Sequence, residues 1–258
     1  MPFVERSRTG HIGVVTLRRP EALNAISTEL ADELAGAVLQ AAADPETWVL
    51  VLRGEGEKAF CVGADLKERR ELDDRGWMRN RAFMRSMFEA VRSVPQPTIA
   101  SVFGFALGGG FELALSCDLI VASEDAQFGL PEVRVGIIPG GGGTQLLARR
   151  IGSAWAKDLI FTGRRMDARA ALALGLVARV VPREALEAAT TELAEEICRS
   201  SPVGVREAKR AIDRGVEVPM EQGIEIEDAG WRRAVASDDR LEGIAAFVEK
   251  REPRWRGR

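Results

Sequence analysis

The stretch "TIASVFGFALGGGFELALSCDLIVAS", residues 98–123, combines the elements that decide the fold. Apolar runs of strand length, at 98–102 and 119–123, enclose three consecutive glycines and an apolar helical pattern from about 109 to 117. A glycine triplet loses conformational entropy when it is ordered, so it indicates unusual dihedral angles or the close approach of another group. Strands that alternate with helices imply β-α units with crossover connections. We therefore expect an α/β protein with buried strands.

The flanking sequence continues this alternation up to a helical C-terminal part. Further strands are expected at 12–17, 48–54 and 176–181, and further helices at 28–43, at 65–92 and between Asp167 and Gly175. Beyond Pro182 the pattern is helical, with capping signals such as Ser237. No flexible linker or low-complexity tract is present. We therefore divide the chain into an α/β core, residues 1–197, and a helical region, residues 198–258, that packs on its own core or on a neighbouring subunit.

Composition and charge are those of an ordinary globular protein. Of the 258 residues, 46% are hydrophobic and 29% are charged, and the net charge of -3 gives no overall attraction to nucleic acid or to an anionic membrane. The longest apolar run, 102–122, is interrupted by glycines and carboxylates, and the N-terminus lacks an apolar signal-peptide core, so neither a membrane span nor a signal peptide is expected. Three cysteines without CxxC spacing indicate reduced thiols in a cytoplasmic protein.

The chain contains a single histidine, His11, and no tyrosine. Hydrolysis by a Ser-His-Asp or Cys-His arrangement would depend on that one residue, and a metal site of several histidines is excluded. His11 lies beside an expected strand, where a strand-edge or surface position is its commoner role. Proton transfer is therefore assigned to carboxylates, lysines or thiols, and no metal site is predicted.

Glycine-rich segments could hold a ligand, but two of them do not fit a nucleotide. The segment 54–59, "GEGEKA", carries two glutamates where a pyrophosphate would lie, and 139–145, "PGGGGTQ", lacks the lysine of a phosphate-binding loop. Three glycine turns remain, at 61–65, 107–112 and 136–143, and two of them could aim backbone N–H groups at one oxygen. The glycines could equally serve only the tight packing of helix on strand, and both interpretations stay open.

Two glutamates favour the first interpretation. Glu112 lies one turn into the helix that Gly109 begins, where it could also cap the helix or interact with its dipole. Glu132 follows the strand at 119–123, and the chain between them could lead back to the same strand ends. A surface position is nevertheless the commoner one for a glutamate. Two carboxylates beside a set of oxyanion donors make a complete acid–base site that needs neither histidine nor metal.

Six motifs follow one another along the chain: "GVVTLRRPEALNAIS", "AFCVGADLKE", "PTIASVFGFALGGGFELALSCDLIVAS", "AQFGLPEVRVGIIPGGGGTQLLARRIG", "FTGRRMDARAALALGLVARVV" and "DDRLEGIAAFVEKREPRW". In this order they resemble the enoyl-CoA hydratase/isomerase, or crotonase, superfamily. The resemblance implies an α/β crotonase-like (ClpP/crotonase) fold, which is a spiral core of ββα units with a C-terminal helical region that forms trimers.

The resemblance also implies catalytic roles. The backbone N–H groups of Ala64 and Gly109 would form the oxyanion hole that polarises a thioester carbonyl and stabilises the enolate. Glu132 would handle the proton at C2, and Glu112 would orient and deprotonate the water that adds at C3. A double-bond isomerase of the family typically needs only the later carboxylate, so Glu112 favours hydration of a 2-enoyl-CoA to a 3-hydroxyacyl-CoA. Such a reaction belongs to fatty-acid or branched-chain acyl-CoA degradation.

The coenzyme A of an acyl-CoA thioester would lie along residues 61–67, as part of the substrate and not as a separate cofactor. The resemblance implies contacts from Cys61, Gly63, Ala64, Asp65, Leu66, Lys67, Gly108, Pro131, Gly140, Phe247 and Lys250. The last two come from the C-terminal helices, which complete a neighbour's site in family trimers, or in hexamers made of two trimers. A core aromatic and a solvated lysine are the alternative roles of these two residues.

Two segments, "ADLKER" at 64–69 and "DRLEGIAAFVEKR" at 239–251, especially resemble the branch that contains 3-methylglutaconyl-CoA hydratase. Some members of this branch also bind AU-rich RNA through a lysine-bearing helix. Here that helix, "KERRELDD" at 67–74, has acidic residues among its basic ones, so RNA binding is expected to be weak. Methylglutaconyl-CoA hydration, double-bond isomerisation and RNA binding are thus the alternatives to a general enoyl-CoA hydratase.

Overall fold

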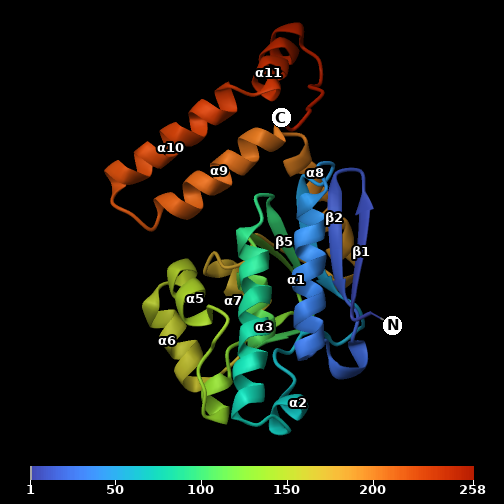
Figure 1. Cartoon of the computed structure of the whole chain (residues 1–258), viewed down its shortest axis with the longest axis vertical. Coiled ribbons are helices and arrows are strands. Elements are labelled where there is room, and N and C mark those ends of the chain that lie inside the picture. Colours follow the sequence, from blue (N-terminus) through green and yellow to red (C-terminus); the bar gives the residue numbers. More distant parts are fainter. Residues whose placement is uncertain (1) are drawn as a thin grey trace.

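The large sheet is the centre of the α/β part of the molecule. The computed structural model describes residues 2–258 (Figure 1). In the order β1-β2-β3-β5-β7-β10, the strands of the large sheet are β1 (Val4–Thr9), β2 (Ile12–Leu17), β3 (Val49–Gly54), β5 (Thr98–Val102), β7 (Leu119–Ser123) and β10 (Arg179–Val181). β1 and β2 pair antiparallel, whereas the other neighbours pair parallel.

A second, smaller sheet contains the intervening strands in the order β4-β6-β8-β9. They are β4 (Ala59–Cys61), β6 (Phe105–Leu107), β8 (Gln127–Gly129) and β9 (Met166–Asp167). Along the chain β3 leads to β4, β5 to β6 and β7 to β8, so successive strands alternate between the two sheets. Because β3, β5 and β7 are neighbours in one sheet and β4, β6 and β8 in the other, the chain follows a spiral of repeated units, as the family resemblance implies.

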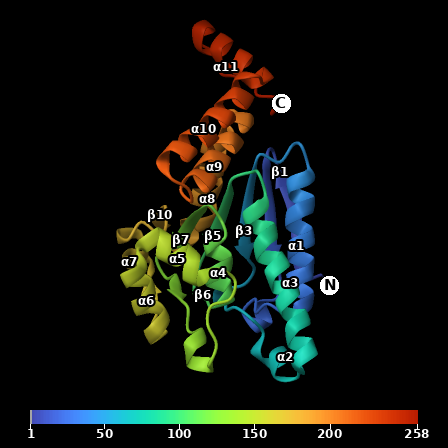
Figure 2. The ribbon, with the colours of Figure 1, turned by 60° about the vertical axis from the view of Figure 1, so that its left-hand side comes forward.

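The helices divide between those of the α/β part, up to α8, and a C-terminal arm. The first set comprises α1 (Thr28–Ala43), α2 (Leu66–Arg70), α3 (Asp74–Ser93), α4 (Gly109–Leu115), α5 (Gly143–Ile151), α6 (Ser153–Thr162), α7 (Ala168–Ala173) and α8 (Leu186–Cys198), with the 3-10 helices η1 (Pro20–Ala22), η2 (Glu132–Val135) and η3 (Arg183–Ala185). The C-terminal arm comprises α9 (Pro202–Gly215), α10 (Met220–Val235) and α11 (Asp238–Glu249). In Figures 1 and 2 this arm extends away from the sheets, beyond the end of α8.

The large sheet is covered on both faces because its central strands are apolar on both. In β3, Leu50 and Leu52 belong to the hydrophobic core that α1 and α3 complete, whereas Val49 and Val51 belong to the core that α8 completes. Figure 2 shows α1 and α3 side by side along one side of the sheet. Near-continuous apolar strands buried on both faces are typical of parallel sheets.

The C-terminal arm is fixed to the core at α9 and leaves much apolar surface uncovered. Lys209 of α9 donates to the Asp118 carboxylate at 2.8 Å and to the Gln96 carbonyl at 2.9 Å. Large apolar side chains remain exposed on the arm: Ile212, Val216, Met220, Ile224, Trp231, Leu241, Ile244, Phe247 and Val248. The predicted division of the chain between residues 197 and 198 lies one residue before the end of α8 at Cys198, and this division and a separate oligomerisation role for the arm stay predictions.

The structure differs from the sequence predictions mainly in where elements begin and end. β1 was not predicted, because only Val4 of its six residues is buried and the strand shows no apolar alternation. The helical region expected at 65–92 is divided into α2 and α3, since the Asp73 side chain accepts the Gly76 N–H and starts a new helix. His11 lies in the turn between β1 and β2, half-exposed, with its ring stacked on Trp48 at a centroid distance of 3.5 Å.

Candidate active site

A cavity of about 780 Å³ brings the glycine turns and both predicted carboxylates together. Apolar side chains form much of its wall: Ile26, Trp77, Met84, Phe88, Val135 and Ile138. The backbone of Ala64 and Gly109 and the side chains of Glu112 and Glu132 also line it. The four residues that the sequence places in the catalytic centre therefore meet in one predominantly apolar site.

Glu112 is buried in the first turn of α4, where its carboxylate is held by a neighbouring glycine segment. Its Oε1 accepts the backbone N–H of Gly141 at 2.7 Å and that of Gly143 at 2.8 Å. α4 begins after Gly108 without a side-chain cap, so Glu112 does not cap its own helix. Burial raises the pKa of Glu112, and the N–H groups of Gly143, Gly141 and Gly140 act in the opposite direction.

Close packing explains why the segment that holds Glu112 is made of glycine. A Cβ atom at Gly141 would lie 2.3 Å from the Phe88 ring, and one at Gly143 would lie 2.9 Å from Oε1 of Glu112. Any larger residue would therefore push the segment away from the carboxylate. The sequence left open whether the glycines serve ligand binding or packing, and at these positions packing is what places the N–H donors.

Glu132 has a different environment at the start of η2. Both oxygens of its carboxylate are buried, and neither has a hydrogen-bond partner among residues 2–258. Burial, followed by the nearby Glu112 charge, raises the pKa of Glu132 to about 7, against opposing effects of its own backbone N–H and of Arg69. A carboxyl group with this pKa holds its proton in part of the molecules near neutral pH and can donate it.

The two predicted oxyanion donors lie close to each other at the ends of β4 and β6. A Cβ atom at Gly109 would lie 3.7 Å from the backbone nitrogen of Ala64, and no group among residues 2–258 accepts either N–H. Gly63 permits this approach, because it has φ of 90° and a Cβ there would lie 2.8 Å from the Gly109 nitrogen. Two such free N–H groups can both donate to one carbonyl oxygen.

The predicted coenzyme A contacts are only partly gathered at this cavity. Ala64, Leu66, Gly108, Pro131 and Gly140 line it. The remaining six, Cys61, Gly63, Asp65, Lys67, Phe247 and Lys250, are not among the residues that line the cavity.

Several of these six have other structural roles. The Cys61 thiol is buried, donates to the Asn24 carbonyl and has its pKa raised to about 12 by burial. Asp65 caps α2 and forms an ion pair of 2.7 Å with Arg19. Phe247 and Lys250 lie at the end of α11 in the C-terminal arm, so a contact with substrate would need a second copy of the chain.

The sequence missed several cavity residues on α2 and α3, chiefly Arg69, Trp77, Asn80 and Arg81. Arg69 lies over the Trp77 ring at 5.1 Å and donates to the side-chain oxygen of Asn80 at 3.3 Å. The helical pattern at 65–92 indicated an amphipathic segment, but nothing in it shows which polar residues face a cavity.

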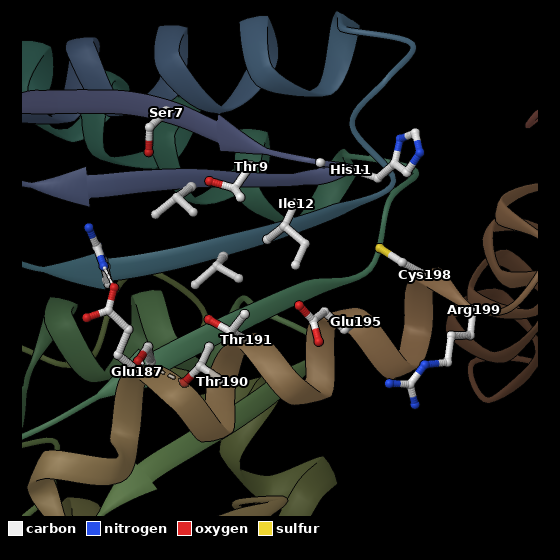
Figure 3. A pocket seen from close by; sticks show the side chains of 15 residues that line it. Ser7, Thr9, His11, Ile12, Glu187, Thr190, Thr191, Glu195, Cys198 and Arg199 are labelled. Atoms are coloured by element: carbon white, nitrogen blue, oxygen red, sulfur yellow. Dashed lines mark hydrogen bonds and ion pairs between the residues drawn. The ribbon is translucent and has the colours of Figure 1, made fainter.

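A second cavity of about 590 Å³ lies on the other face of the large sheet, between its first strands and α8 (Figure 3). Its wall includes Thr9, Ile12, Thr190 and Cys198, and its Glu187 is paired with Arg53 at 2.7 Å. The second cavity therefore lies apart from the Glu112 and Glu132 cavity.

Residues 2–258 contain neither a metal-binding cluster nor a membrane-spanning helix. There, no group of three or more His, Cys, Asp or Glu side chains could hold a metal ion. Over this range, no helix is long and apolar enough to span a bilayer.

Comparison with known proteins identifies the fold and the family. A solved structure of enoyl-CoA hydratase from Bacillus anthracis superimposes with a TM-score of 0.97 at 42% identity, covering 99% of this chain and all of that one. Enoyl-CoA hydratase domain-containing protein 2 of Bos taurus is 44% identical over 95% of this chain and 84% of its own length. Methylglutaconyl-CoA hydratase of Mus musculus is 41% identical over 95% of this chain and 80% of its own length.

The spiral of two sheets, with its buried pair of carboxylates, is thus the α/β fold of the crotonase class. The family model described as enoyl-CoA hydratase/isomerase matches residues 7–258, and the chain belongs to this family.

Proposed function

We propose that the protein is an enoyl-CoA hydratase, which adds water reversibly across the 2,3 double bond of a 2-enoyl-CoA thioester to give a 3-hydroxyacyl-CoA. The observation that carries this proposal is the pair of carboxylates in one cavity, one held by backbone N–H groups and the other free of partners among residues 2–258. One group suited to activating water and one suited to donating a proton are what hydration requires.

The chemistry follows from the positions of these groups. The thioester oxygen accepts the N–H groups of Ala64 and Gly109, which stabilises the negative charge that develops there as an enolate. Glu112 takes a proton from water as the oxygen of that water bonds to C3. Glu132 gives its proton to C2, and the enolate returns to a thioester. Transfer of a proton from Glu112 to Glu132 through solvent restores the starting state.

Double-bond isomerisation moves one proton and needs only one carboxylate, which Glu132 could supply. Glu112 is nevertheless buried and accepts two N–H groups, an arrangement that isomerisation does not need. Hydration uses both carboxylates and is therefore the function that these residues support better.

The test is hydration of crotonyl-CoA by Glu112→Gln and Glu132→Gln. Each variant should lower kcat by about 10²- to 10⁴-fold, the usual contribution of a general acid or base, while its circular dichroism stays unchanged. Glu29→Gln is the matched control, because Glu29 lies exposed on α1 and away from the cavity. Near-normal turnover in the Glu132 variant would contradict the proposal.

A second candidate, hydration of an acyl group that itself bears a carboxylate, is favoured by Arg69. Its guanidinium lies in the cavity, and no hydrogen bond or ion pair among residues 2–258 occupies its terminal nitrogens. A relative 41% identical to this chain is named methylglutaconyl-CoA hydratase, and its substrate name denotes such an acyl group. A free guanidinium matches a carboxylate in geometry and charge.

We also propose how the protein assembles and where in the cell it acts. The exposed apolar side chains of the C-terminal arm support self-association, as a trimer or as two trimers. Phe247, with 86% of its surface exposed, would then lie against another copy. A cytoplasmic location and a role in fatty-acid or branched-chain acyl-CoA degradation stay predictions, as does the absence of a separate cofactor.

A further inference from the structure

Arg81 contacts the peptide group that holds Glu112. Its Nη1 donates to the carbonyl oxygen of Gly140 at 2.5 Å. The N–H of the same peptide group belongs to Gly141 and donates to Oε1 of Glu112 at 2.7 Å. A guanidinium and a buried carboxylate are thus connected through a single amide.

This connection strengthens the hydrogen bond at its far end. An amide whose carbonyl accepts from a cation is polarised, so its N–H becomes a better donor. Glu112 is buried, and its ionised form depends on such donors. Arg81 also attracts the carboxylate directly and so lowers the pKa of Glu112, but Arg81 is exposed at the edge of the cavity, where water screens this attraction. The peptide group gives Arg81 a second, hydrogen-bonded path to Glu112.

We propose that Arg81 is a positioning residue for Glu112 and acts through the Gly140–Gly141 peptide group. Arg81 keeps the Gly141 N–H directed at Oε1. The hydrogen bonds of 2.7 and 2.8 Å both reach Oε1, so Oε2 is the oxygen that we assign to the water that Glu112 activates. The inference rests on the proposed function, because it assigns Glu112 the role of base.

Other charged groups around Glu112 act by other routes. Arg92 on α3 donates at 2.9 Å to the carbonyl of Gly141, which belongs to the next peptide group and not to the one that holds Glu112. Arg69 on α2 and Glu132 on η2 interact with Glu112 through space. On the remaining packed elements, Cys61 of β4 donates to Asn24, Arg150 of α5 donates to the carbonyls at the end of α4, and Arg149 of α5 pairs with Glu217.

The direct test is a pH titration of the Glu112 carboxyl carbon by NMR in protein carrying ¹³C-labelled glutamate. Glu132→Gln serves as the background, because it removes the coupled titration of the second carboxylate. Arg81→Gln in that background should move the Glu112 titration to higher pH, and Arg81→Lys should restore part of the shift. Arg85→Gln, an exposed change four residues away on α3, should leave it unchanged. An unchanged titration in Arg81→Gln would overturn the proposal.

Kinetics with otherwise wild-type protein provide the second measurement. With crotonyl-CoA, Arg81→Gln should lower kcat at pH 6 by about 10- to 100-fold, the usual effect of losing an outer hydrogen bond to a functional group. Relative to the wild type at the same pH, activity should recover in part as pH rises, because ionisation of Glu112 then depends less on its hydrogen-bond donors. A merely structural role would lower stability and leave the shape of the pH profile unchanged, which would count against the proposal.

The two measurements separate this inference from the proposed function. If the wild-type protein hydrates no enoyl-CoA, the proposed function fails, while the NMR titration still decides whether Arg81 acts on Glu112. If hydration occurs and the titration does not respond to Arg81, only the inference fails.

Discussion

The carboxylates of Glu112 and Glu132 line one cavity in unlike environments. Glu112 accepts the N–H groups of Gly141 and Gly143, whereas Glu132 has two buried oxygens without a partner among residues 2–258. Hydrogen bonds favour the ionised form, and burial without them favours the protonated form. Within one site, Glu132 is therefore suited to act as the acid and Glu112 as the base.

The stability of the protein should depend on pH through Glu132. Burial raises the pKa of Glu132 from the ordinary glutamate value of 4.5 to about 7, so the folded state favours the protonated form. The favourable contribution is complete below pH 4.5 and is lost as pH rises to about 7, by up to about 3 kcal/mol. Glu132→Gln stays neutral, so its free energy of unfolding should exceed that of the wild type at pH 8 but not at pH 4.

Chemical denaturation at a series of pH values measures this difference. An equal effect of Glu132→Gln at pH 4 and pH 8 would mean that Glu132 does not titrate as its burial implies.

The rate of hydration should fall in alkaline solution. If Glu132 donates the proton to C2, kcat/KM for crotonyl-CoA decreases as pH rises above about 7, where the free enzyme loses that proton. Dehydration of 3-hydroxybutyryl-CoA should show the same kcat/KM profile, because hydration consumes no net proton and the ratio of kcat/KM in the two directions equals a pH-independent equilibrium constant. A kcat/KM for hydration that does not fall above about pH 7 would be inconsistent with this assignment.

The sequence predicted the central strands, the alternation with helices and the meeting of Glu112 with Glu132, because buried strands and glycine turns leave strong local signals. It did not predict β1, whose edge position exposes most of its residues. It also missed Arg69 and Arg81, since a charged helix has the same local pattern whether its arginines face water or a cavity. That distinction depends on α2 and α3 folding over the glycine segments, which are remote in the sequence.

Gly141→Ala should disrupt both the packing and the carboxylate. The new Cβ would lie 2.3 Å from the Phe88 ring, so the segment must move and take its N–H away from Glu112. We expect a loss of about 1–3 kcal/mol in the free energy of unfolding, as for other overpacked sites, together with lower kcat. Gly36→Ala is the matched control, since a Cβ at this helical glycine meets nothing within 4 Å and should stabilise α1.

A second-site change separates the two effects. Phe88→Leu shortens the side chain that meets the new Cβ, so the double variant should recover part of the activity lost in Gly141→Ala. If the double variant is no more active than Gly141→Ala, contact with Phe88 is not the reason for the defect.

Self-association should depend on the apolar surface of the C-terminal arm. Ile224 and Trp231 on α10 are 57% and 63% exposed, and an apolar surface of this kind is covered in most stable proteins. We expect the wild type to sediment as a multiple of 28.1 kDa and Ile224→Glu to dissociate toward the single chain. Glu225→Gln, a polar change at the next position, should leave the assembly intact. A wild type that sediments at 28.1 kDa would rule out this role for the arm.

Substrate choice should depend on Arg69. With its terminal nitrogens free among residues 2–258 and its guanidinium stacked on Trp77, it can donate to a carboxylate at the far end of an acyl chain. A hydrogen bond to a charged group contributes about 1.5–3 kcal/mol, so Arg69→Met should lower kcat/KM for 3-methylglutaconyl-CoA by about 10- to 100-fold. The same variant should change kcat/KM for crotonyl-CoA little, because the acyl chain of that substrate bears no carboxylate.

Arg70→Met is the control, since Arg70 is exposed and pairs with Glu71 outside the cavity. Equal losses on both substrates would show that Arg69 supports the site as a whole and does not select the acyl group.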